Sequence, residues 1–294
     1  MARVAMAACP VAAIRLDNGV DEMDKQTKRG LSIGRDDPFP RPLLDTDLGV
    51  CYLGHHNDAS FGATPYLVLG KSSKGNDIAV MVDVPRFSAS AVRAVKSLAP
   101  EGPNYLFLTH VDDTADHNAW VTEFPMLKRI FHSGDLGIHN WIGDETLEDV
   151  EILLKGESVT EGELKVWDIE GNEVHHGMKY INELNDRQFI ILHTPGHSPG
   201  SITLMYQPSG QEQAVLFTGD TYAWTTRDGG HMSGFPRYGN DLTKQAKTLQ
   251  MIGVLADRWN IIAPGHGHPR VYGNESYERK LEELDNAINE LKLY

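Results

Sequence analysis

The sequence predicts a mixed α/β protein in which outer helices cover two β-sheets. Short apolar runs rich in β-branched residues alternate with amphipathic stretches along the 294-residue chain. The runs come in sequential pairs before the helical stretches, an order that fits two sheets better than one doubly wound sheet. Eight strands are expected, each bounded by Gly, Pro, Asp or Asn. They cover residues 64–70, 77–85, 104–110, 129–133, 189–195, 201–206, 214–220 and 260–266.

Helical periodicity appears in four segments, which are residues 88–99, 117–124, 243–259 and 277–293. The last segment is highly charged, so we expect it to form a solvated amphipathic cover. We expect one main domain at residues 46–294, preceded by an N-terminal arm at residues 1–45. Residues 143–188 are acidic and weakly patterned, which predicts an excursion from the core.

Composition and charge disfavour several classes of protein. The net charge of -14 argues against nucleic acid as a partner, because the field would repel phosphates. No apolar stretch approaches the roughly 20 residues of a membrane span, and the N-terminus lacks the pattern of a signal peptide. Only Cys9 and Cys51 are present, too few for a disulfide framework. We therefore expect a soluble protein of the cytoplasm or a plastid that acts on a small molecule, with a homodimer as one option for its assembly.

Candidate metal ligands follow four of the expected strands. His110 ends the third strand, His197 follows the fifth, Asp220 ends the seventh and His266 ends the eighth. Strand ends on one edge of a sheet converge in space, so these side chains can surround one point. Imidazole and carboxylate ligands together suit zinc, and also iron or manganese. In TPGHSPGS, FTGD and APGHGHP the ligand follows a glycine, where a tight turn can aim it toward a metal.

Four motifs resemble the successive metal-binding motifs of the metallo-β-lactamase superfamily, in the same order. They are THVDDTADH, LHTPGHSPGS, FTGDT and APGHGHP. The resemblance covers about residues 50–271 and implies a four-layer αββα sandwich. HTPGHSPGS and PGHG look most like the glyoxalase II and persulfide dioxygenase branch. FGATPYLVL, LTHVDDTADH and LFTGDTYAW resemble a group from photosynthetic organisms in which this domain follows a ferredoxin-like segment.

This resemblance implies one or two divalent metal ions and a set of ligands for them. By this likeness, one ion is held by His110 and His197, the other by Asp116, His117 and His266, and Asp220 bridges both. Zinc is the first expectation for the metal, with iron or manganese as alternatives.

The first motif departs from the usual pattern of the superfamily, HxHxDH. Here the chain reads HVDDTADH, two residues longer and without the second histidine. Asp112 is the first choice for the missing ligand, because side chains two apart in an extended segment share a face. Asp113 is the rival, since it lies three and four residues before Asp116 and His117 on an incipient helix. If neither reaches the metal, we expect only one ion. A carboxylate in place of an imidazole makes the ligand set harder, which raises the preference for iron or manganese over zinc.

The implied reaction is hydrolysis of a small ester, thioester or lactone by a metal-bound hydroxide. A metal lowers the pKa of its bound water to about 7 and polarises the carbonyl under attack. Asp116 is expected to orient the hydroxide and to shuttle its proton. The alternative function is an iron-dependent persulfide dioxygenase or another redox di-iron protein.

Substrate contacts are expected from the long loop TYAWTTRDGGHMSGFPRYGN, which follows Asp220. Arg227 could meet a substrate carboxylate and Tyr238 an oxyanion, while His231 could be a further ligand. Packing at the surface is an equally open reading for each of these three residues.

The N-terminal arm contains AMAACPVAAIRLD, which resembles the last part of a bacterial-type ferredoxin motif. Of that motif's cysteines only Cys9 is present, so no iron–sulfur cluster is expected. We interpret the arm as the remnant of an upstream ferredoxin domain. The alternative is an unrelated ACP tripeptide.

Overall fold

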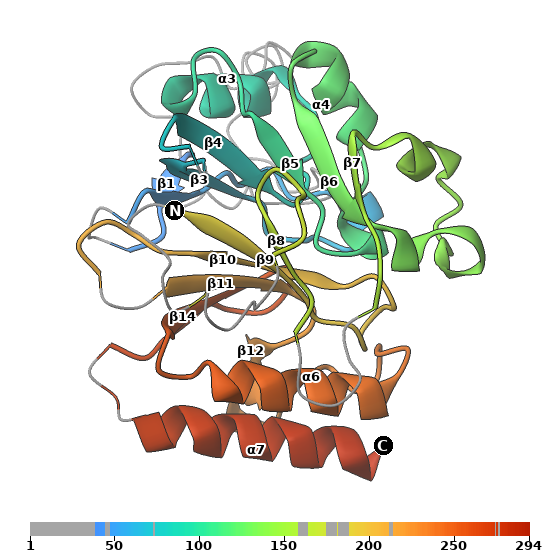
Figure 1. Cartoon of the computed structure of the whole chain (residues 1–294), viewed down its shortest axis with the longest axis vertical. Helices are drawn as coiled ribbons and strands as arrows, with labels where there is room; N and C mark the ends of the chain where they lie inside the picture. The colour runs from blue at the N-terminus through green and yellow to red at the C-terminus, as the bar shows by residue number, and fades with distance from the viewer. Residues whose placement is uncertain are drawn as a thin grey trace, which may run out of the picture.

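The structure is a computed structural model that describes residues 39–44, 48–72, 74–157, 164–174, 181, 188–211, 214–273, 275 and 277–294. Cys9 and most of the expected N-terminal arm lie outside the described residues. Two β-sheets pack face to face, and each carries helices on its outer face (Figure 1). Helices α3 (Ala89–Leu98) and α4 (His117–Glu123) cover the first sheet, and α6 (Leu242–Val254) and α7 (Tyr277–Leu293) cover the second. The predicted αββα sandwich is confirmed.

In the described part of the chain, the first sheet has the strand order β1-β2-β3-β4-β5-β6-β7. These strands are Arg41–Pro42, Val50–Tyr52, Tyr66–Lys71, Asp77–Val82, Tyr105–Phe107, Lys128–His132 and Ile152–Leu154. Strands β1 to β4 pair antiparallel, whereas β4 to β7 pair parallel. The C-terminal ends of β4, β5 and β6 therefore lie at one edge of the sheet.

The second sheet has the order β15-β14-β11-β10-β9-β8 among the described residues. These strands are Arg270–Val271, Trp259–Pro264, Ala214–Gly219, Ile202–Tyr206, Phe189–His193 and Val166–Asp168. Strand β11 is parallel to β14, and β10 is antiparallel to both β9 and β11. Strands β9, β11 and β14 therefore run in one direction and end at one edge. A separate hairpin joins β12 (Ala223–Thr225) to β13 (His231–Ser233).

The two sheets are linked at the edge where these strands end. The Ile202 N–H donates to the Thr109 carbonyl at 2.9 Å, which ties β10 to the segment after β5. The Tyr66 hydroxyl donates to the Pro264 carbonyl at 2.8 Å, across from β3 to β14. The ends of β5, β9, β11 and β14 are thereby brought to one place.

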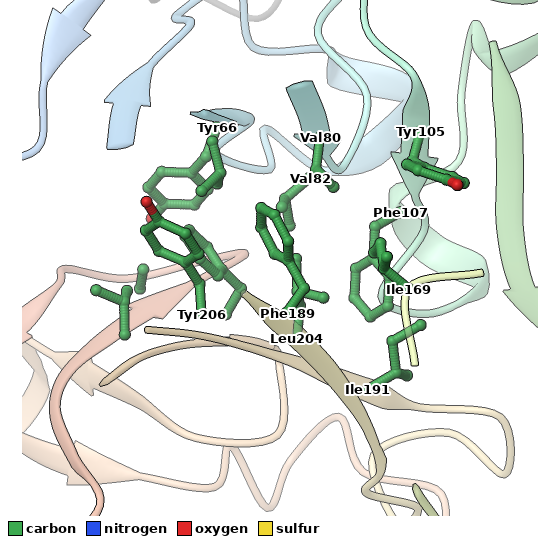
Figure 2. Packing of buried hydrophobic residues seen from close by; sticks show 14 of the residues in the cluster. Tyr66, Val80, Val82, Tyr105, Phe107, Ile169, Phe189, Ile191, Leu204 and Tyr206 are labelled. Atoms are coloured by element: carbon green, nitrogen blue, oxygen red, sulfur yellow. The ribbon is translucent and has the colours of Figure 1, made fainter. Parts of the chain in front are cut away.

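Alternate side chains of the central strands supply two different cores. In β9, Phe189 and Ile191 lie in the core between the sheets, while Ile190 and Leu192 lie in the core with α6 and α7. Figure 2 shows Phe189 between the sheets, close to residues of β4 such as Val82. Burying each such side chain stabilises the fold by about 1.5–3 kcal/mol. Because both faces are buried, the strand reads as one continuous apolar run.

All eight expected strands and all four expected helices are present, and most of them are shorter than expected. Helix α6 ends at Val254 instead of Trp259, because Trp259 pairs with Ala214 at the start of β14. Residues 143–188 are not simply an excursion: β7 and β8 lie within this range, and each joins the edge of one sheet. Among the described residues, no helix combines the length and the apolar character needed to cross a bilayer.

Candidate metal centre

His110 is held in place by two buried carboxylates that bind the backbone on either side of it. The Thr109 N–H donates to Asp83 Oδ1 at 2.9 Å, and the Val111 N–H donates to Asp135 Oδ2 at 3.0 Å. The His110 side chain is 1% exposed. Its Nδ1 atom lies 3.0 Å from Thr109 Oγ1, which leaves Nε2 for a ligand.

Asp112 and Asp113 both reach the His110 ring, from a 3-10 turn (η2, Val111–Asp113) that follows His110 directly. Asp112 Oδ2 lies 3.5 Å from His110 Nε2, and Asp113 Oδ2 lies 3.7 Å from His110 Nδ1. The tight turn places the two neighbouring carboxylates at different atoms of one imidazole. The two candidates for the missing ligand are therefore both at the site.

His197 approaches from the turn after β9, opposite Asp112. Its Nε2 atom lies 3.6 Å from Asp112 Oδ2, and its ring meets the His110 ring edge-on at 4.8 Å between centroids. The turn needs Gly196, because φ is +140° there and an added Cβ would lie 2.3 Å from Gln245 Cα.

Asp135, a residue that the sequence analysis missed, fixes the turn that carries His197. Its Oδ2 accepts from Ser198 Oγ at 2.7 Å, and its Oδ1 accepts from the Gly200 N–H at 2.6 Å. Since Asp135 also binds Val111, it joins the loop after β5 to the loop after β9. Its place in the short turn that follows β6 was the available signal.

Asp220 lies between His197 and His266. Its Oδ1 is 2.8 Å from His266 Nδ1, and its Oδ2 is 3.8 Å from His197 Nε2. Gly265 permits the approach of a further carboxylate, because an added Cβ there would lie 2.7 Å from Asp113 Oδ2 and 3.2 Å from Asp220 Oδ1. The two oxygens of Asp220 thus face different imidazoles.

These side chains form two overlapping groups of donor atoms. The donors of His110, Asp112 and His197 lie within 4.8 Å of one another, and so do those of His110, Asp113 and Asp220. Both groups consist of imidazole and carboxylate, the donors preferred by zinc, iron and manganese.

The donor atoms also lack the hydrogen bonds that buried polar groups normally make. Within the described residues, no partner is found for the buried atoms His110 Nε2, Asp113 Oδ1 and Oδ2, His197 Nδ1 and Nε2, and His266 Nε2. Leaving a buried donor or acceptor unsatisfied costs about 1–3 kcal/mol. A cation could be held by His110 Nε2, by one nitrogen of His197, by His266 Nε2 and by an oxygen of Asp113, so the residues present fit a metal ion.

The pKa shifts of the donor side chains also favour a cation at this site. Burial opposes a charge on His110, yet the surrounding carboxylates, Asp113 first, raise its pKa well above the ordinary value. Burial likewise would lower the pKa of His266, but Asp220 and Asp113 raise it to about 10. Despite burial, the imidazoles, led by His266, hold the pKa of Asp220 well below its usual range. The carboxylates therefore favour positive charge at this point, as a cation site requires.

The structure places His117 outside this group. Its Nε2 lies 3.0 Å from Asp144 Oδ2, and its Nδ1 lies 3.1 Å from the Arg129 guanidinium. Since an arginine side chain is only a donor, Nδ1 of His117 must accept and Nε2 must donate. Neither nitrogen is left for a metal, and the adjacent guanidinium would repel one. Helix α4 begins at His117 itself.

Asp116 also lies apart from the buried donors. It is exposed, its φ is +67°, and it is the residue that precedes α4. Its Oδ2 accepts from Asn57 Nδ2 at 3.0 Å and from the Phe87 N–H at 2.8 Å. The structure gives it the role of joining three segments of the chain, in place of the expected contact with the metal ligands.

Two of the three expected substrate contacts, Arg227 and His231, lie against Glu290 of α7. Arg227 binds Glu290 Oε1 of α7 at 2.9 Å, and His231 Nε2 lies 3.5 Å from Glu290 Oε2. Their loop forms the β12–β13 hairpin, which packs on α7 and so turns both side chains toward that helix. Tyr238 is 69% exposed.

Trp141 is a second residue at the site that the sequence analysis missed. Its indole Nε1 donates to Asp112 Oδ1 at 2.5 Å. No motif marks this contact, because Trp141 lies 29 residues from Asp112 along the chain.

Comparison with solved structures agrees with this architecture. A crystal structure of the DIM-1 metallo-β-lactamase exposed to ceftazidime is 14% identical, covers 86% of this chain and 98% of its own, and has a TM-score of 0.51. A second structure of DIM-1 is 12% identical, covers 85% and 97%, and has a TM-score of 0.50. An archaeal metallo-β-lactamase superfamily protein from Sulfolobus tokodaii is 16% identical and covers 85% and 100%, at a TM-score of 0.46 too low to support an inference.

The fold and the donor groups define a protein of the metallo-β-lactamase fold with a candidate metal centre. In sequence, no protein-family model matches the chain, and no curated protein matches it. At these identities the structural likeness establishes the fold alone.

Proposed function

We propose that this protein is a metal-dependent hydrolase of small ester, thioester or lactone substrates. The observation that carries the proposal is the position of Asp220, with one oxygen toward His197 and the other toward His266. A carboxylate that faces two imidazoles through different oxygens suits a pair of metal ions about 3.5–4 Å apart, the arrangement of two-metal hydrolases.

Six side chains would hold the metal. In this assignment His110, Asp112 and His197 would hold one ion, Asp113 and His266 would hold the other, and Asp220 would offer one oxygen to each. The assignment keeps five ligands of the sequence analysis, adds Asp113 and leaves out Asp116 and His117. Zinc is the metal we expect first, although three carboxylates favour iron or manganese more than an all-histidine site would.

A bound divalent ion supplies Lewis acidity, which polarises the bond under attack and makes a bound water acidic. The protein residues hold that chemistry in place. Asp135 fixes the backbone beside His110 and His197, so the two imidazoles keep their separation. Asp113 has two oxygens without a hydrogen bond, so one would be available to an ion and the other to a proton.

The substrate class comes from the sequence motifs. HTPGHSPGS and PGHG resemble the glyoxalase II-like branch, whose reaction is the hydrolysis of a thioester. The further resemblance to the ferredoxin-linked group of photosynthetic organisms favours a soluble enzyme of the cytoplasm or plastid. We propose a small-molecule substrate and neither nucleic acid nor a membrane as partner.

Removal and return of metal tests this function directly. Protein purified without chelators should hydrolyse at least one of a panel of small esters, thioesters and lactones. Dialysis against a chelator should abolish that hydrolysis, and zinc, iron or manganese should restore it. Hydrolysis that survives complete removal of metal would contradict the proposal.

A second function is favoured by one specific observation. His110, His197 and Asp112 form a group of two histidines and one carboxylate, the ligand set of many non-haem iron enzymes that use oxygen. An iron-dependent persulfide dioxygenase, or another redox di-iron protein, would use this group. One iron per chain together with oxygen uptake on a persulfide substrate would replace the hydrolase by this alternative.

A further inference from the structure

Trp141 lies in a short segment that connects η3 (Ser133–Asp135) to η5 (Glu145–Asp149). Glycines with left-handed backbone stand on both sides, Gly137 at φ +61° and Gly143 at φ +73°. The segment is held by its own hydrogen bonds, since Asn140 Nδ2 donates to the Asp144 carbonyl at 2.8 Å and the Gly143 N–H donates to the Asn140 carbonyl at 3.0 Å. It is thus a defined turn that carries Trp141.

The two oxygens of Asp112 are divided between Trp141 and the imidazoles. Oδ1 accepts the hydrogen bond from the indole, while Oδ2 lies 3.5 Å from His110 Nε2 and 3.6 Å from His197 Nε2. An indole N–H can only donate, so its partner is held as an acceptor with its second oxygen toward the imidazoles. A flexible carboxylate is thereby given one orientation where the superfamily usually has a rigid imidazole.

About half of the Trp141 surface remains open to solvent although its N–H is engaged. Its side chain is 48% exposed, whereas that of Asp112, to which it is bonded, is 18% exposed. A large apolar ring is therefore presented beside a partly accessible ligand of the metal centre. Small-molecule sites are lined mainly by apolar and aromatic side chains with a few polar groups that fix orientation.

We propose that Trp141 positions Asp112 through its N–H and binds an apolar group of the substrate with its exposed ring. The inference rests on the proposed hydrolase function and narrows it to substrates with an aliphatic or aromatic group beside the bond that is cleaved. The two roles use different parts of one side chain, so two substitutions separate them.

Trp141→Phe removes the N–H and keeps an aromatic ring, and Trp141→Ala removes both. Outer residues that orient a ligand typically contribute 10–100-fold to metal affinity. Both variants should therefore bind zinc about 10–100-fold more weakly in competition with a chromogenic chelator. Ile138→Ala, in the same turn and 92% exposed, is the control and should match the wild type. Unchanged zinc affinity in Trp141→Phe would overturn the positioning role.

The apolar role is tested by binding of acetate and hexanoate to the metal-loaded protein, which does not depend on turnover. Wild type and Trp141→Phe should bind hexanoate at least about tenfold more tightly than acetate, since each buried methylene contributes about 0.8 kcal/mol. Trp141→Ala should lose most of that preference. A wild type without the preference, or an alanine variant that keeps it, would overturn this role. Failure of the hydrolase proposal would appear separately, as a metal-loaded wild type that cleaves none of the substrates.

Discussion

Asp220 Oδ1 lies 2.8 Å from His266 Nδ1, and this pair joins the ends of β11 and β14 at the candidate metal centre. The other oxygen of Asp220 is directed at His197, from the end of β9. The three strands run in one direction within one sheet, so their ends supply three ligands from one edge. The first sheet supplies the remaining ligands, which follow the end of β5 at the edge where the two sheets are linked.

Asp220→Ala should disrupt both halves of the metal centre. The substitution removes an oxygen from each half, so metal content measured by elemental analysis should fall from two ions per chain to one or none. Hydrolysis should fall at least about a hundredfold, because loss of a residue that only orients a ligand already costs about 10–100-fold. Two ions per chain in this variant would show that Asp220 is not a bridge.

Asp112→Ala and Asp113→Ala should each lower metal content, because their carboxylates lie 3.5 and 3.7 Å from different atoms of the His110 ring. His117→Gln should leave metal content unchanged, since Arg129 and Asp144 already engage both nitrogens of that ring. Elemental analysis of the three variants measures their metal content and shows which of these side chains bind metal. Loss of metal in His117→Gln, with metal retained in Asp113→Ala, would restore the ligand set that the sequence motifs implied.

Asp135→Ala should destabilise the whole protein as well as the site. It leaves the N–H groups of Val111 and Gly200 and the hydroxyl of Ser198 without their common acceptor. Each unsatisfied buried donor costs about 1–3 kcal/mol, so a loss of about 3 kcal/mol or more in the free energy of unfolding is expected. Urea denaturation measures it. Asp135→Asn, which keeps the shape and one acceptor, should lose less; equal stability of wild type and Asp135→Ala would refute the joining role.

His132 and His193 should make the fold sensitive to acid. Their buried rings stack at 4.2 Å between centroids. Burial lowers the pKa of His132 to about 4, and burial together with the charge of His132 lowers the pKa of His193 to about 3. In the unfolded chain both histidines take up protons near pH 6.5, so the unfolded state binds more protons below that pH. Their contribution to stability is therefore present above pH 6.5 and is lost as the pH falls toward 4.

The size of this effect follows from the number of protons. Each neutral histidine makes the free energy of unfolding fall by about 1.4 kcal/mol per pH unit between pH 6 and 4. Urea denaturation as a function of pH measures the slope. His193→Phe retains a ring in the stack but cannot take up a proton, so it should lower the slope by about 1.4 kcal/mol per pH unit. A slope equal to that of the wild type would contradict the prediction.

The long central strands could be predicted from the sequence, because both of their faces are buried. Strand β11, for example, is buried at all six positions, and its apolar run ends directly at Asp220. The edge strands could not be predicted, since β1 and β15 have two residues each and carry no periodicity. Strand β8 lies in an acidic region, and its pairing with β9 depends on contacts that sequence patterns do not record.

The ligands after glycine turns were equally accessible to sequence reasoning, because a turn, a strand end and an imidazole occur together. The ligands of the first motif could not be assigned from the sequence, since its spacing allowed either Asp112 or Asp113. The structure brings both carboxylates to His110. Asp135 and Trp141 act on residues distant along the chain. Asp135 lies 63 residues from Ser198, so only the folded structure reveals its role.

Metal stoichiometry tests the central claim most directly. Protein purified without chelators, and protein that has been stripped and then titrated with zinc, should both reach two ions per chain by elemental analysis. Saturation at two ions, with Asp220→Ala reaching one at most, is the result that this account predicts. A wild-type protein that holds no transition metal and binds none on titration would contradict it.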